Sequence, residues 1–283
     1  MLTSNGYVLD DSPSRLGRLE PVPAAERDDR GALWRRLRRD GYLFLKGHLE
    51  PAEVLEFRRH YFETLLPAGL TAVGTDPQAG IAADADHDRA AYRRLLFDDI
   101  IPGAQYEALC RTPRIADWFA WLLEEHVHLH KRKIIRHTKP GERGIGTATQ
   151  AHYDLVYLRE GSDRVLSMWI PLGDIPIEVG GLAYLEGSHR RVLAEEAHGE
   201  QIRPAAFMTA NLPGMADRYD ARWLVADYAA GDVMVHSAHI VHAGLDNVDP
   251  EGRMRLSTDI RYQRVTDAID WRWQQHWHDQ DGL

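Results

Sequence analysis

Three adjacent residues in the middle of the chain, His152, Tyr153 and Asp154, bring an imidazole close to a carboxylate. In an extended strand, residues two positions apart point to the same face, so His152 and Asp154 could chelate one metal ion. The tripeptide alone fits a surface strand with solvent-facing polar side chains better. A metal site would therefore require a further ligand from another part of the chain.

Three histidines further along the chain could supply that ligand. His236, His239 and His242 follow a Gly231-Asp232 turn and the apolar stretch Val233–Val235. Any one of them would complete a set of two histidines and one carboxylate, which leaves three positions of an octahedral iron open. Spacing alone does not select the ligand, and the other two must be hydrogen-bonded or exposed histidines.

Cysteine content limits the kinds of metal site that the chain can form. The sequence has 15 histidines and one cysteine, Cys110, so it can form neither an intrachain disulfide nor a thiolate cluster. Imidazole and carboxylate ligands suit iron, zinc, manganese or nickel rather than copper(I) or an iron–sulfur cluster. A chain without disulfides fits a reducing compartment, and we expect a cytoplasmic protein.

A short basic motif, Arg253-Met254-Arg255-Leu256-Ser257, could bind a carboxylate. A guanidinium can grip a carboxylate through two parallel hydrogen bonds, which lysine does poorly. Ser257 would face the same side as Arg255 and add a hydroxyl donor. On this motif alone, however, a surface basic pair that balances Glu251 and Asp249 is the better interpretation.

Composition and charge exclude several classes of partner. The 283 residues are 44% hydrophobic and 27% charged, an ordinary globular mixture with enough apolar material for a core. The formal charge of −9 argues against a general affinity for nucleic acid or anionic membrane. No run approaches the ~18 apolar residues that span a bilayer, and residues 1–13 lack the apolar core of a secretory signal. We expect a monomer or a small homo-oligomer.

The first half of the chain is predicted to be mainly helical. Pro51 suits the first turn of a helix, and apolar residues from Val54 to Leu65 recur on one face of it. The predicted elements are helices at Ala25–Arg39, 51–66, Asp88–Leu96 and Arg114–Glu125, a strand at Tyr42–Leu45 and a loop rich in Gly, Ala and Asp at 67–90.

The second half is predicted to consist of short strands separated by turns. The strands are expected at Val127–Thr138, Val165–Leu172, Leu182–Leu185, Leu224–Tyr228, Val233–His236 and Met254–Gln263. Such a series favours a sandwich or barrel. We therefore expect a mainly β fold, a double-stranded β-helix (jelly roll, cupin-like) buttressed by α-helices. It would form a single domain over 1–283, with a helical layer at 1–126, a jelly-roll core at 127–265 and a C-terminal tail at 266–283.

Further motifs follow His152-Tyr153-Asp154 in a fixed order. They are Met168-Trp169-Ile170-Pro171-Leu172, Gly180-Gly181-Leu182, Leu185-Glu186-Gly187-Ser188-His189, Gly231-Asp232-Val233 with His242 and Asn247, and Arg255-Leu256-Ser257. No single motif is specific, but the ordered series resembles the phytanoyl-CoA hydroxylase-like (PhyH) family of iron(II)/2-oxoglutarate-dependent oxygenases. The resemblance runs from about 150 to 263 and is weaker over the N-terminal helices.

This resemblance implies a choice among the three histidines. In the family, the distal ligand comes a few residues before an asparagine and roughly a dozen before an arginine. His242 fits this order best, because Asn247 and Arg255 follow it. The resemblance thus implies that His152, Asp154 and His242 are the catalytic triad and the ligands of Fe(II).

The resemblance also implies how 2-oxoglutarate is bound. Arg255 and Ser257 correspond to the family's grip on the far carboxylate, with Arg253 as an alternative to Arg255, and Trp169 would pack beside it or be an ordinary core residue. The family often has a hydroxyl donor after the distal histidine, which Ala243-Gly244 cannot supply. Ser257, or Lys133 or Arg136 on the strand at 127–138, could take over that contact.

The implied reaction consumes O2 and 2-oxoglutarate, releases succinate and CO2, and hydroxylates an unactivated C–H bond, with ascorbate as an optional reductant. Desaturation, epoxidation and ring formation are alternative outcomes. Halogenating relatives replace the carboxylate ligand with a small residue, so Asp154 favours hydroxylation. Two other classes stay open on this evidence: a cupin-type metal dioxygenase or isomerase that does not use 2-oxoglutarate, and a non-catalytic binding protein on the same fold.

The substrate is expected to be a small molecule, such as a secondary metabolite. Arg132, Arg136 and His137 could contact a polar or anionic substrate, or could form a solvated basic edge. The aromatic tail could cap the pocket, form a subunit contact or pack as a terminal helix on the jelly roll; it contains Trp271, Trp273, His276 and Trp277.

Overall fold

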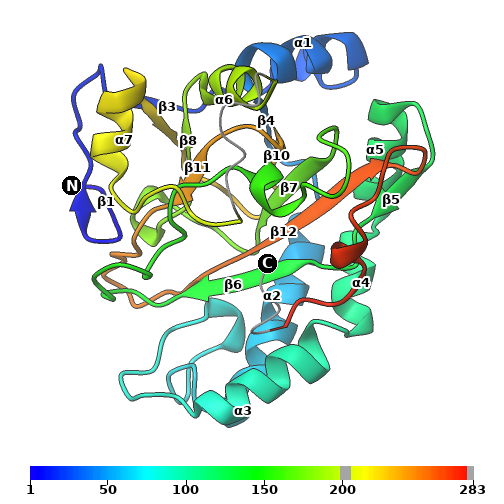
Figure 1. Ribbon diagram of the computed structural model, residues 1–283. Coiled ribbons are helices and arrows are strands. Elements are labelled where there is room, and N and C mark those ends of the chain that lie inside the picture. The colour runs from blue at the N-terminus through cyan, green and yellow to red at the C-terminus, as the bar shows by residue number, and fades with distance from the viewer. Residues whose placement is uncertain (198–204, 279–283) are drawn as a thin grey trace.

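Two β-sheets form the centre of the molecule in the computed structural model, which describes residues 1–197 and 205–278 (Figure 1). The larger sheet has the order β4 (Tyr42–Leu45), β10 (Val233–Ser237), β7 (Leu166–Pro171), β12 (Arg255–Arg264) and β5 (Val127–Leu129), with β6 (Ile134–Thr138) also paired to β12. The smaller sheet has the order β11 (His242–Gly244), β8 (Leu182–Leu185), β9 (Trp223–Val225) and β3 (Leu16–Arg18). A separate two-stranded ribbon joins β1 (Thr3–Ser4) to β2 (Tyr7–Val8). The predicted mainly β, jelly-roll fold is confirmed.

An apolar layer joins the inner faces of the two sheets. Trp169 and Met234 of the larger sheet pack in one buried cluster with Tyr184 and Leu224 of the smaller sheet. The ring centroid of Trp169 lies 4.8 Å from that of Tyr228, which follows β9. This packing fixes the spacing between the sheets, which is the usual role of interdigitated inner faces in a β-sandwich.

Strand β12 is paired on both edges. Thr258 lies opposite Ile170 of β7 on one side and Ile135 of β6 on the other. Because a shift of one residue would exchange the two faces of the strand, this double pairing fixes which side chains point inward. The inward set has odd numbers from Arg255 to Arg261, and the even-numbered residues face the helices.

Helices cover the outer face of the larger sheet. The α-helices are α1 (Arg30–Asp40), α2 (Pro51–Leu65), α3 (Arg89–Arg94), α4 (Ala104–Cys110), α5 (Pro113–Leu123), α6 (Ser188–Ala197) and α7 (Leu212–Tyr219). Figure 1 shows α2, α4 and α5 on one side of β6 and β12. Phe119 of α5 stacks on Tyr262 of β12, with ring centroids 4.5 Å apart, and Phe57 of α2 stacks on Tyr106 of α4 at 5.4 Å. These contacts belong to the largest apolar cluster of the described residues.

Short irregular helices complete the secondary structure. A π-helical turn at Leu95–Ile100 continues α3, and 3-10 turns lie at Ala24–Glu26, Leu66–Ala68, Pro77–Ala79, Asp154–Tyr157, Ile177–Val179 and Trp271–Gln274. Among the residues described, no helix is both long and apolar enough to cross a membrane.

Two predicted strands differ from the structure in ways that matter for the site. The strand expected at Val127–Thr138 is interrupted between β5 and β6, where His130 pairs with Arg261 through the backbone. The tripeptide from His152 to Asp154 is not a regular strand either: His152 forms an isolated bridge with His242, and Asp154 begins a 3-10 turn. Tyr153 between them is extended, which keeps the two side chains on one side. Helices α4, α6 and α7 were not predicted from the sequence; each has ten residues or fewer, so its periodic pattern is short.

Candidate metal and substrate site

His152 and His242 are held together by their own backbones. The His152 N–H donates to the His242 carbonyl over 3.1 Å, and the His242 N–H donates to the His152 carbonyl over 2.9 Å. In an antiparallel pair, residues that exchange both hydrogen bonds place their side chains on the same face. The two imidazole centroids accordingly lie 4.3 Å apart.

Both imidazoles present the same nitrogen to the site. His152 Nδ1 lies 2.9 Å from the Gln150 carbonyl, and His242 Nδ1 lies 3.1 Å from the Ile240 carbonyl. A carbonyl oxygen only accepts hydrogen bonds, so each Nδ1 carries the proton and each Nε2 keeps a free lone pair. The Nε2 atoms lie 3.6 Å and 3.8 Å from Asp154 Oδ1. One ligand atom from each of the three residues thus falls within 4.8 Å of the others.

Asp154 is charged and buried, and one of its carboxylate oxygens is available to bind a metal ion. Burial alone would raise its pKa, but Arg261, His152 and His236 hold the pKa well below its ordinary value. Ser167 donates to Oδ2, and Arg261 Nη2 lies 3.1 Å from Oδ1, an oxygen that accepts no hydrogen bond. Two neutral imidazoles and one carboxylate with free lone pairs fit a divalent ion such as iron(II).

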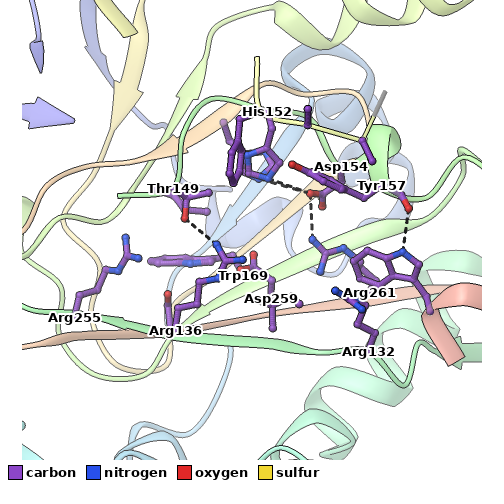
Figure 2. Close-up of a pocket in the computed structure, with 18 residues that line it drawn as sticks. Arg132, Arg136, Thr149, His152, Asp154, Tyr157, Trp169, Arg255, Asp259 and Arg261 are labelled. Carbon is purple, nitrogen blue, oxygen red and sulfur yellow. Dashed lines mark hydrogen bonds and ion pairs between the residues drawn. The ribbon is translucent and has the colours of Figure 1, made fainter. Parts of the chain in front are cut away.

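A cavity of about 440 Å³ opens from the triad (Figure 2). Arg255 lies at one side of it in the view and Arg261 at the other, with Trp169 and Asp259 between them. Ser257 also lines the cavity, as the alternation along β12 requires. Burial raises the pKa of Asp259, which faces this space.

Arg255 is positioned as a buried anion receptor. Its Nη1 donates to the Gly180 carbonyl over 2.8 Å, while its Nε has no hydrogen-bond partner. Burial lowers its pKa to about 10, so the guanidinium stays charged at neutral pH. Gly244 leaves room for it, because a Cβ there would lie 3.3 Å from Arg255 Nη1 and 3.1 Å from the Thr149 amide nitrogen. Arg253 instead pairs with Asp249 at 2.7 Å and is not among the residues that line the cavity.

Lys133 and His137 do not reach the cavity. The alternation that directs Arg136 inward directs both of these residues toward the helices. Lys133 pairs with Glu107 of α4, and His137 Nδ1 is hydrogen-bonded to the Tyr61 hydroxyl of α2 at 2.8 Å. The expectation that Lys133 contacts the cosubstrate and His137 the substrate therefore has no support in the geometry.

Comparison with known proteins gives the family. The family model described as phytanoyl-CoA dioxygenase (PhyH) matches residues 37–255. The chain belongs to this family. It is 29% identical over 241 residues to a 1-deoxypentalenic acid 11-beta-hydroxylase of Streptomyces exfoliatus, covering 83% of this chain and 82% of the relative. An ectoine dioxygenase of Nocardia farcinica is 24% identical over 268 residues, covering 88% and 85%.

Solved structures agree with the phytanoyl-CoA dioxygenase assignment. The non-heme alpha ketoglutarate dependent epimerase SnoN of nogalamycin biosynthesis has a TM-score of 0.56 at 25% identity, over 85% of this chain and 86% of that one. The carbocyclase SnoK of the same biosynthesis has a TM-score of 0.59 at 22% identity, over 93% and 92%. The SnoK match shows a shared fold alone.

Three residues of the cavity received little or no weight in the predictions made from the sequence. Arg261, Trp273 and Arg132 line the cavity. Arg261 was not named from the sequence, whereas Arg132 was named only as one alternative for substrate contact and Trp273 only as part of a tail that could cap the pocket. Arg261 could have been found by extending the period of two from Arg255 along β12. Long-range packing of the C-terminal segment places Trp273 at the cavity, where its Nε1 donates to the Tyr157 carbonyl over 3.0 Å.

The two remaining candidate histidines have separate environments. His236 is fully buried, and its Nε2 lies 3.5 Å from Asp154 Oδ2 while its Nδ1 faces the Tyr184 hydroxyl at 3.0 Å. His236 therefore lies near the other carboxylate oxygen of Asp154 and is not part of the triad. His239 lies 3.7 Å from Asp163 and does not line the cavity.

Proposed function

We propose that this protein is an iron(II)- and 2-oxoglutarate-dependent dioxygenase that hydroxylates an unactivated C–H bond of a small molecule. The observation that carries the proposal is the convergence of His152 Nε2, His242 Nε2 and Asp154 Oδ1 at the edge of a cavity that also contains buried Arg255. Relatives named as a hydroxylase, a dioxygenase and an alpha ketoglutarate dependent epimerase support the cosubstrate and the reaction class.

Within this proposal, each residue has a defined task. His152, His242 and Asp154 hold iron(II), which supplies oxygen activation and C–H oxidation when bound. Arg255 and Ser257 bind the far carboxylate of 2-oxoglutarate through charge-assisted hydrogen bonds. Trp169 closes the floor of the cavity and excludes water from that ion pair, which strengthens it.

Secondary metabolism is the setting that we propose for the substrate. The relatives include an enzyme named for 1-deoxypentalenic acid, and the related SnoN structure comes from nogalamycin biosynthesis. Asp154 provides a carboxylate ligand at the metal site. Halogenating relatives lack this carboxylate, so its presence favours hydroxylation over halogenation.

Binding measurements with iron(II) and 2-oxoglutarate test the proposal without a known substrate. Under anaerobic conditions, the wild-type chain should bind one iron(II), and 2-oxoglutarate should then bind in an iron-dependent manner. His152→Ala and Asp154→Ala should abolish both, whereas His239→Ala should retain both because His239 lies outside the triad. Iron binding that survives either triad substitution would refute the metal assignment. If the iron-loaded protein did not bind 2-oxoglutarate, the result would indicate a metal enzyme of another class.

A further inference from the structure

The two carboxylate oxygens of Asp154 lie in different environments. Oδ1 faces the Nε2 atoms of His152 and His242 at 3.6 Å and 3.8 Å, and it accepts no hydrogen bond from the described part of the chain. Oδ2 accepts a hydrogen bond from the Ser167 hydroxyl, and His236 Nε2 lies 3.5 Å from it. The protein therefore directs donors at Oδ2 and leaves the lone pairs of Oδ1 to a metal ion.

One row of residues across the larger sheet creates this difference. Ser167 of β7 lies opposite His236 of β10 on one edge and opposite Arg261 of β12 on the other. Directly opposed residues on neighbouring strands point to the same face of a sheet, so all three side chains approach Asp154 from one side. Ser167 and His236 are completely buried. Arg261 Nη2 lies 3.1 Å from Oδ1, an ion pair that Figure 2 shows at the edge of the cavity.

His236 is oriented to donate toward Oδ2. Its Nδ1 lies 3.0 Å from the hydroxyl of Tyr184, which is also completely buried. A neutral imidazole has one N–H and one lone pair, and a lone pair on Nε2 would face the negative carboxylate. The Tyr184 hydroxyl therefore donates to Nδ1, and Nε2 carries the proton. Nε2 has no hydrogen-bond partner within the described residues, so Asp154 Oδ2 is the nearest carboxylate oxygen that can supply the missing acceptor.

The number of Asp154 oxygens that bind the metal decides how many coordination positions stay open. A carboxylate can bind an ion through one oxygen or through both. Two imidazoles and one carboxylate oxygen leave three positions of an octahedral iron open. The two chelating atoms of 2-oxoglutarate and one oxygen molecule would fill all three. A second oxygen from Asp154 would take a position that the cosubstrates need.

We propose, on the basis of the function proposed above, that Ser167 and His236 are positioning residues that restrict Asp154 to metal binding through Oδ1 alone. Their hydroxyl and N–H donors hold Oδ2 on the side of the sheet, away from the ion. A hydrogen bond to a carboxylate is charge-assisted and stronger than a neutral one, so it competes with the metal for that oxygen. Neither side chain has to contact the metal or a substrate to have this effect.

Calorimetry on the anaerobic, iron-loaded protein tests the proposal. Ser167→Ala and His236→Leu should each weaken 2-oxoglutarate binding by about tenfold or more, as is usual when a residue that supports a metal ligand is removed. Iron(II) itself should still bind, because Asp154 keeps both oxygens. The visible charge-transfer band of 2-oxoglutarate chelated to iron(II), recorded at saturation, should shift in both variants, since its position depends on the other ligands of the ion.

Conservative variants separate hydrogen bonding from packing. Ser167→Thr keeps the hydroxyl, and His236→Gln keeps an N–H close to the position of Nε2, so both should restore most of the lost affinity and the wild-type band. Thr258→Val is the control. It removes a buried hydroxyl that is hydrogen-bonded to Tyr106 at 2.5 Å on the opposite face of the same sheet, and it should leave 2-oxoglutarate binding unchanged.

Defined results would overturn the proposal. Wild-type affinity with an unshifted band in Ser167→Ala or His236→Leu would remove the role of that residue. Weak binding that persists in Ser167→Thr and His236→Gln, or that appears in Thr258→Val, would assign the effect to packing. Loss of iron(II) binding in Ser167→Ala would show that the hydroxyl supports the ligand as a whole.

Two features of the design keep the outcomes distinct. If His236→Leu does not fold, the comparison of Ser167→Ala with Ser167→Thr decides. Binding of iron(II) and 2-oxoglutarate by the wild-type protein is measured first, so that failure of the proposed function is recognised before any variant is compared.

Discussion

The two faces of the β6–β12 ladder bury similar polar side chains in different ways. On the helix-facing side, Lys133 pairs with Glu107, and Thr258 shares a hydrogen bond of 2.5 Å with the Tyr106 hydroxyl. On the cavity side, Arg255 and Arg261 both keep buried nitrogens that have no hydrogen-bond partner. The helix-facing polar groups therefore satisfy their hydrogen-bonding capacity within the chain, whereas some cavity-facing groups have no partner in it.

This difference separates structural polar residues from ligand-binding ones. Buried polar groups in native proteins are nearly always hydrogen-bonded, so each exception requires a reason. Among the described residues outside the site, unsatisfied side-chain atoms occur one to a residue, whereas Arg261 alone has two and lies beside Asp154, which has another. The concentration of such atoms in one cavity indicates that the missing partners are ligands.

The largest expected effect falls on the cavity side. Arg255→Gln should weaken 2-oxoglutarate binding by about 30-fold or more, because removal of one partner of a buried charge pair costs at least about 2 kcal/mol. Calorimetry on the iron-loaded protein measures this directly. Arg253→Gln is the matched control and should change the affinity by less than about twofold, since Arg253 pairs with Asp249 instead. A larger effect at Arg253 than at Arg255 would show that Arg253, and not Arg255, binds the far carboxylate of 2-oxoglutarate.

The helix-facing side should respond in stability and not in ligand binding. Glu107→Gln leaves the Lys133 ammonium, which is 1% exposed, without its anion, so we expect a loss of about 2 kcal/mol in the free energy of unfolding. Lys133→Met should cost less, because Glu107 is partly exposed and can be solvated. Urea unfolding gives both values. Weaker 2-oxoglutarate binding by Lys133→Met would show that this residue does serve the cavity.

The smallest effect is a pH dependence on the helix-facing side. Burial lowers the pKa of His137, on this side, to about 3, below the unfolded value of about 6.5. Below pH 6.5 the unfolded state binds more protons, so stability falls as the pH decreases toward 4. We expect His137 to account for a loss of about 1–2 kcal/mol in the free energy of unfolding between pH 7.5 and 5.0. His137→Phe should reduce this difference in urea unfolding, and an unchanged difference would contradict the assignment to His137.

The sequence predicted more of the metal site than of its surroundings. His152, Asp154 and His242 lie together as expected, because short-range chain geometry and motif order carry that information. Lys133 and Arg136 were both assigned to the site, yet residues an odd number of positions apart on a strand face opposite sides. The same rule excludes a shared site for Arg136 and His137.

The remaining differences arise from tertiary packing. The position of Trp273 depends on a hydrogen bond to Tyr157 across 116 residues, for which no local pattern exists. The break between β5 and β6 likewise follows from pairing with β12 and not from a turn signal. Strands β4, β7 and β8 could be predicted because each one has a short apolar run bounded by glycine or charged residues.

The reciprocal backbone hydrogen bonds between His152 and His242 affect which metal ion the site binds. They set the separation of the two imidazoles through the peptide chain itself, so the coordination geometry exists before any ion arrives. A rigid nitrogen and oxygen site of this kind favours nickel or copper over ferrous iron by intrinsic affinity. Correct loading therefore depends on which ion the cell makes available, and misincorporation of a tighter-binding ion is a natural route to inactive protein.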